Sequence, residues 1–233
     1  MTTLAEMIDR CSNILADPSN TTYSDALITE WLSDAIADYS IHFGRLKTSS
    51  HGGGIVSKLD LEVGTIAVLS VEFPVGQTPK QFIPYSNYSQ ELFHQGQLAY
   101  RRVPYNDPNN SDRIEFSESI DLSPSLNLRF TITHGFEDSG TGILYSPSAA
   151  SSADTFSIPD HHENILLLFV EWQATRYLMH KEQQSPTSGS SLLMSQFSAN
   201  ASSLHAKYKE AIKNAGNDRQ TSEAVQWKLD KWD

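Results

Sequence analysis

Apolar side chains recur at helical spacing in two stretches near the start of the chain. The first begins at a capping box formed by Thr3 and Glu6 and ends at Asp17-Pro18. The second begins near Thr22 or Ser24 and carries the most regular apolar stripe in the chain. That stripe comprises Ile28, Trp31, Leu32, Ala35, Ile36, Tyr39 and Phe43. Both stretches predict amphipathic helices that pack on a common core.

Residues 157–184 predict a third, longer helix. Pro159 stands just inside its start, Ser157 or Asp160 can cap it, and Ser185-Pro186 ends it. Two apolar sets line it, Ile165, Leu168, Phe169 and Trp172 on one side and Leu167, Val170, Ala174 and Tyr177 on the other. A helix that is apolar on both sides needs cover on both sides. Either it is the central helix of one chain's bundle, or it also packs against a neighbouring subunit. In the second case the candidate interface residues are Leu167, Val170, Trp172 and Tyr177.

Between residues 55 and 134 the apolar period changes to two, which predicts strands. The strands are expected at residues 55–63, 65–73, 98–103, 113–116 and 126–133. In the second strand, Ala67, Leu69, Val71 and Phe73 are expected to share one face. The TSSHGGG segment at residues 48–54 is expected to be a flexible boundary, and residues 81–97 a loop or edge. Residues 135–153, rich in Gly, Ser, Ala and Thr, are expected to be a mobile connection.

A fourth helix is predicted from Leu193 to about Gly216, antiparallel to the third because the turn between them is short. The segment after it contains Val225, Trp227, Leu229 and Trp232 among charged residues. Their spacing allows either an added strand or a short docked helix. Because tryptophan is a common anchor at interfaces, these four residues are candidates for partner contact. The alternative is that this segment folds back on the chain's own core.

These patterns predict an α+β fold: an antiparallel bundle of about four helices, with a small antiparallel β domain inserted between the second and third. The expected divisions are a first helical part at residues 1–50 and a β domain with a flexible loop at 51–156. A second helical part at 157–216 and an extended partner-binding tail at 217–233 follow.

The net charge of the chain limits which partners it can bind. The chain has 28 acidic and 17 basic residues, a net charge of −11, which argues against a surface that grips phosphate backbones. Its single cysteine, Cys11, cannot form a disulfide within the chain. No basic, apolar leader opens the sequence, and no window is apolar enough to span a membrane. We therefore expect a protein that is made in a cytoplasm and makes no membrane contact.

The sequence contains little that predicts chemistry. The run from Asp160 to Glu163, DHHE, has the residue types of metal ligands, but neighbouring positions on a helix point about 100° apart. The glycines at 52–54 lack the lysine of a phosphate-binding loop. Carboxylates in the β region, including Asp112, Glu115 and Glu118, leave open a carbohydrate-active enzyme, although exposed acids are usually solvated. We expect no catalytic, cofactor-binding or metal-binding residue and no cofactor.

The order of these elements resembles the head-to-tail adaptor, or connector, proteins of tailed bacteriophages. The likeness lies in the order and pattern of residues 23–214 and in four segments: ITEWLSDAIADYS, GTIAVLSVEF, LNLRFTITHGFE and SIPDHHENILLLFVEWQATRYLMHKEQ. A long insert rich in serine and asparagine departs from that pattern, so the tail component that the β domain meets is left open.

The resemblance implies a structural virion protein at the neck of the particle. Its subunits would form a ring, typically of twelve, below the portal protein, and would extend the DNA channel toward a tail or nozzle protein. DNA would pass through without specific binding, and C-terminal segments would reach the portal. A tail terminator or a baseplate or tube component is the alternative in the same class.

Overall fold

The computed structural model describes residues 2–86, 98–104, 112–137, 144–145, 151–184 and 190–229, the last stretch from residue 218 by its backbone alone. The fold is mixed α+β, with four α-helices and antiparallel sheets among these residues. The chain divides into two compact units. The helical unit comprises Met1–Phe43 and His134–Asp233, and the β unit comprises Gly44–Thr133. Each unit has its own set of buried apolar side chains.

The first two helices begin where the sequence predicts. Helix α1 (Leu4–Ile14) follows a complete capping box, in which Thr3 and Glu6 each accept a bond from the other's backbone N–H. Helix α2 (Asp25–His42) is capped by Ser24. The predicted stripe of α2 is buried along its whole length, from Ile28 to Phe43. The predicted caps of both helices and the predicted buried stripe of α2 are therefore confirmed.

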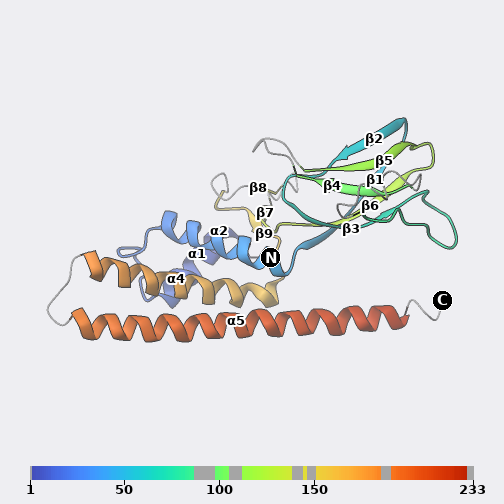
Figure 1. The fold of residues 1–233 in the computed structure, drawn as a ribbon. Coiled ribbons are helices and arrows are strands. Elements are labelled where there is room, and N and C mark those ends of the chain that lie inside the picture. Colours follow the sequence, from blue (N-terminus) through green and yellow to red (C-terminus); the bar gives the residue numbers. More distant parts are fainter. Residues whose placement is uncertain are drawn as a thin grey trace. The chain divides into compact units, whose positions relative to one another are not determined.

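The third predicted helix starts differently from the prediction. A short 3₁₀ turn, η2 (Asp160–His162), precedes α4 (Glu163–Gln184), and Pro159 occupies the cap position without a side-chain cap bond. The Ser157 hydroxyl accepts a hydrogen bond from the Gly135 N–H instead. Figure 1 shows α4 running between α2 on one side and the long helix α5 on the other.

Helix α5 (Ser190–Leu229) is longer than predicted. The expectation that it ends at Gly216 and continues as an extended tail is wrong, since the helix runs through this glycine for another 13 residues. A glycine inside a helix costs only about 1 kcal/mol relative to alanine, which is too little to stop a helix favoured on both sides. At 40 residues α5 is roughly 60 Å long, so it extends well past α4, which has 22.

Two three-stranded antiparallel sheets form the β unit. Their orders are β1-β6-β3 and β2-β5-β4. The strands are β1 (Arg45–His51), β2 (Ile55–Asp60), β3 (Thr65–Glu72), β4 (Tyr100–Val103), β5 (Arg113–Asp121) and β6 (Leu126–Ile132). Strands β1 and β2 continue one another, as do β5 and β6, so a two-stranded ribbon passes from one sheet to the other at a shared corner.

Of the predicted boundary at residues 48–54, residues 52–54 form this corner and residues 48–51 belong to β1. Gly53 and Gly54 have φ values of +80° and +82°, and backbone bonds join both glycines to Leu122 on the other arm of the ribbon. Glycine adopts such angles without the strain that a Cβ would add. The segment therefore lies inside the β unit, and the change between units falls instead between Phe43 and Gly44.

Alternation of buried and exposed residues is exact in β6 and broken in β3. Leu126, Leu128, Phe130 and Ile132 are all buried in β6. In β3, register shifts after Thr65 and Val68 change which face a side chain occupies, so Leu69 is 50% exposed while Val71 is buried. The predicted common face of residues 67–73 is therefore wrong for Leu69.

A small third sheet belongs to the helical unit, although the predicted β domain extended to residue 156. Its strands are β7 (Phe136–Glu137), β8 (Leu144–Tyr145) and β9 (Thr155–Phe156). Phe136 and Phe156 pack at a ring separation of 4.9 Å in the core of the helices. Most of the predicted mobile connection, at residues 138–143 and 146–150, and most of the predicted loop, at 87–97, lie outside the described residues.

Candidate interaction surfaces

The predicted subunit-interface residues of α4 lie within the helical unit's own core. Leu167 is 8% exposed and Val170 is 1% exposed, because α2 and α5 cover the two sides of the helix. For Leu167 and Val170 the structure therefore agrees with the first alternative, in which α4 is the central helix of one chain's bundle. An interface between subunits needs a different surface.

Trp172 and Tyr177, the other two interface candidates, are partly buried and form aromatic contacts inside the helical unit. Trp172 stacks on His205 of α5 at 4.5 Å with nearly parallel rings. Tyr177 meets Tyr23 and Trp31 edge-on, with ring centroids about 6 Å apart. These contacts use the aromatic faces to hold α2, α4 and α5 together.

The predicted partner-contact residues fall at the far end of α5. Val225, Trp227 and Leu229 belong to the last turns of the helix, and Trp232 lies outside the described residues. Positions 225 and 229 are four residues apart, about one helical turn. A helix that docks in a groove therefore suits this segment better than an added strand does.

The side chains of the DHHE run make structural contacts. His162 Nδ1 lies 2.6 Å from the Tyr39 hydroxyl of α2. Glu163 is 3% exposed, and its Oε2 accepts a bond of 2.5 Å from Arg10 of α1, while its Oε1 has no hydrogen-bond partner among the described residues. Within the described part of the chain, no three His, Cys, Asp or Glu side chains are placed to hold a metal ion. The Arg10–Glu163 pair joins segments 153 positions apart, and no periodicity signals it.

His134, the first residue of the helical unit after the β unit, is the centre of a second hydrogen-bond network. No pattern in the sequence indicates this network. The His134 Nε2 lies 2.8 Å from the Phe43 carbonyl oxygen, and its Nδ1 lies 3.1 Å from both oxygens of Ser157. The His134 backbone N–H donates to the Ser40 hydroxyl. The end of α2 and the residue that follows the β unit are thus joined directly.

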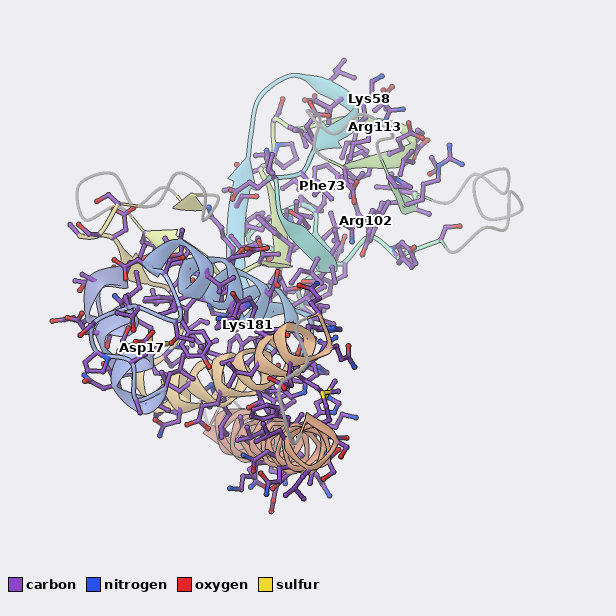
Figure 2. All side chains as sticks on the ribbon, turned by 90° about the vertical axis from the view of Figure 1, so that its left-hand side faces the viewer. Asp17, Lys58, Phe73, Arg102, Arg113 and Lys181 are labelled. Carbon is purple, nitrogen blue, oxygen red and sulfur yellow. The ribbon has the colours of Figure 1, made fainter. Side chains whose placement is uncertain are left out.

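The carboxylates considered for catalysis are held by arginines. Asp112 pairs with Arg102, whose guanidinium also donates to backbone carbonyls of β3 and so ties one sheet of the β unit to the other. Glu115 pairs with Arg101 and Arg113, and the hydrogen bonds from Arg101 are the main cause of its lowered pKa. Arg102 and Arg113 are labelled in Figure 2. A carboxyl kept ionised in this way is suited to holding strands together rather than to donating a proton.

The turn between α1 and α2 is built on one acidic side chain, Asp17, labelled in Figure 2. Its carboxylate accepts hydrogen bonds from the backbone N–H groups of Tyr23, Thr22 and Thr21 and from the Thr21 hydroxyl. These bonds, that from Tyr23 first, lower the pKa of Asp17 to about 2.

A groove of about 320 Å³ lies where α1, α4 and α5 meet. Its lining residues are Ile14, Leu15, Glu171, Thr175, Asn200, Ser203, Leu204 and Lys207. Burial raises the pKa of Glu171, and the positive charge of Lys207 opposes that rise. Nearby in the core, burial raises the pKa of the Cys11 thiol to about 12, so this cysteine remains a protonated packing residue.

Almost all of the net charge belongs to the helical unit. It carries 19 acidic and 9 basic residues, a net charge of −10, whereas the β unit carries 9 acidic and 8 basic residues. Residues 1–43 alone contain seven acids and one base, Arg10, which is bound to Glu163. The electrostatic field of the protein therefore comes mainly from its helices.

Neither the models of known protein families nor the curated proteins contain a match to this chain. Across the described helices, no segment is both long and apolar enough to cross a membrane.

Proposed function

We propose that this chain is the subunit of a head-to-tail adaptor ring of a tailed bacteriophage. The observation that carries the proposal is the order of its parts. A helical unit is interrupted after its second helix by a β unit at Gly44–Thr133, and its last helix continues past the helix beside it. This order agrees with the resemblance seen in the sequence.

In this proposal the far end of α5 is the portal-binding element. The segment that contains Val225, Trp227 and Leu229 is helical, so each subunit would present a helix rather than an extended strand to the portal. The part of α5 that packs on α4 would remain with the subunit, since Ala215 is the last buried side chain among those that the structure describes. The β unit would face a tail or nozzle protein.

The charge distribution supports a channel role. Because the helical unit carries a net charge of −10, a ring of twelve copies would present more than a hundred net negative charges near its axis. Like charge repels the phosphate backbone, so DNA would slide through without binding. The protein would then be located at the neck of the virion, between capsid and tail.

Removal of the residues after Gly216 tests the proposal. The truncated chain should keep its fold, because it retains every core side chain that the structure describes, up to Ala215, and should lose binding to the purified portal protein. Circular dichroism measures the first result, and mass measurement of the mixture measures the second. Trp227→Ala should weaken binding at least tenfold, and Lys228→Ala serves as the matched control. Portal binding that survives truncation would refute the assignment of α5, and a map of the intact particle without this chain at the neck would refute the function.

A further inference from the structure

The outward side of α2 is acidic. Ala26, Glu30, Asp34, Ala37 and Ile41 follow one another at intervals of three or four residues, and all five are exposed. Ile41 is 72% exposed, which is unusual for a large aliphatic side chain on a helix whose other side is fully buried. No lysine or arginine occurs in α2. This surface, the α2 face, therefore combines negative charge with an exposed apolar residue.

The outward side of α5 has a small net positive charge, because one exposed acid, Glu210, lies beside the exposed Lys209 and Lys213. Its exposed residues repeat with the same spacing along six turns: Leu192, Ser195, Ala199, Ser202, Ala206, Lys209 and Lys213. Leu192 is 64% exposed. No charged residue occurs between Ser185 and Ala206, although the chain as a whole is strongly acidic. Among the described residues, neither lysine forms an ion pair. We call this surface the α5 face.

These two faces cannot cover each other within one chain. Helices α2 and α5 both pack on α4 (Figure 1) and meet each other through Asp38 and Tyr208, whereas each face is defined by exposed residues directed away from that shared core. Two copies, however, can bring an α2 face and an α5 face together. Because the two surfaces differ, each copy would use one face for the copy before it and the other for the copy after it.

We propose that the α2 face of one copy packs against the α5 face of the next. The inference rests on the proposed function and deepens it, because a ring needs two different complementary surfaces on each subunit. Glu30 and Asp34 attract Lys209 and Lys213 across the contact, and opposite charge guides association and fixes its direction. In an antiparallel contact of this register the exposed Ile41 lies near Ser202 and loses contact with water. Without this pairing, repulsion between units of net charge −10 would oppose assembly.

Reversing the charge of each face in turn tests the proposal. The α5 variant Lys209→Glu/Lys213→Glu has two acidic faces, and the α2 variant Glu30→Lys/Asp34→Lys has two basic faces. Each variant alone should associate at least tenfold more weakly than the natural chain in sedimentation experiments. An equal mixture of the two should recover association, because every contact between unlike copies again joins opposite charges. A merely structural effect of the substitutions would not be reversed by mixing.

The matched control is Lys58→Glu/Lys181→Glu, which changes the net charge by the same amount at two exposed positions outside both faces. It should associate like the natural chain. Cysteine pairs give a second measurement: Ala37→Cys and Ala206→Cys chains, mixed and oxidised, should form a crosslinked dimer, since each position lies three residues from a paired charge, Asp34 or Lys209, in an antiparallel contact and the natural Cys11 is buried. A natural chain that stays monomeric up to about 1 mM, or variants that associate unchanged, would overturn the inference.

The outcome separates this inference from the proposed function. Self-association is measured on the chain alone, whereas the truncation after Gly216 tests portal binding and leaves both faces in place. A chain that assembles through these faces but ignores the portal keeps the inference and loses the function. A portal-binding chain whose charge-reversed variants assemble normally keeps the function and loses the inference.

Discussion

Replacement of Arg10 by methionine should destabilise the helical unit by leaving a buried carboxylate without its partner. The Glu163 side chain is 4% exposed and depends on Arg10 for its ionic hydrogen bond, while the Arg10 side chain is 44% exposed. Breaking a fully buried pair costs about 3–5 kcal/mol, and a surface pair contributes at most about 1 kcal/mol. Because one partner reaches solvent and the other does not, we expect a loss of about 2 kcal/mol for Arg10→Met.

A second substitution should restore part of that stability. Glu163→Gln keeps the shape of the side chain and removes its charge, so the double variant buries no unpaired charge. We expect the double variant to be about 1 kcal/mol more stable than Arg10→Met alone. A second substitution rarely restores stability that a first one has removed. A double variant that is more stable than Arg10→Met would therefore identify the buried charge of Glu163 as the cause.

Urea unfolding at pH 7, followed by circular dichroism at 222 nm, measures these differences through the helices. The slope of free energy against urea should remain unchanged, because the surface exposed on unfolding is the same. Lys181→Met, at an exposed position on α4, is the control and should lie within about 0.5 kcal/mol of the natural chain. If Arg10→Met is equally neutral, or the double variant is less stable than Arg10→Met, the account of this pair is refuted.

Three further substitutions have defined outcomes. The lowered pKa of Asp17 means that its contribution to stability is complete above about pH 4 and is lost as the pH falls through about 2, so the melting temperatures of the natural chain and Asp17→Asn should converge as the pH falls from about 4 to 2. Constant separation would contradict this. Tyr208→Phe removes a buried hydroxyl that donates to Asp38 and should cost about 1–2 kcal/mol in urea unfolding; no change would show that the bond contributes nothing. Gly64→Ala should destabilise the β unit by about 1–2 kcal/mol or more, because φ is +85° and a Cβ would approach the Thr133 hydroxyl to 2.6 Å; unaltered thermal unfolding would contradict that strain.

Contacts that are local along the chain could be predicted from the sequence. The capping box at Thr3, the Ser24 cap and the buried stripe of α2 depend on residues within one or two helical turns, and all are present. Strand β6 was predictable because strict alternation needs only that one face of a sheet be buried. Strand β1 was missed because it is an edge strand whose residues are mostly polar and exposed, so it has no apolar period.

The predicted interface on α4 failed for a reason that periodicity cannot detect. Leu167 and Val170 form a second apolar side, but a sequence pattern shows only that the side is covered and does not identify the covering segment. Here the cover is α5, which begins at Ser190, six positions after the end of α4 at Gln184. The surfaces left without cover, on α2 and α5, contain small and charged residues that resemble ordinary solvated helix faces.

The residue pattern was enough to predict where α1, α2 and most strands begin, which sides of the helices are apolar, and that the chain is acidic. The tertiary structure alone decided that α4 is enclosed by its own chain, that Glu163 is buried against Arg10, and that the glycines at 52–54 form a corner inside the β unit. The difference arises because these interactions join residues at different separations along the chain. Capping and periodicity act between neighbours along the chain, whereas burial and ion pairing depend on residues that only folding brings together.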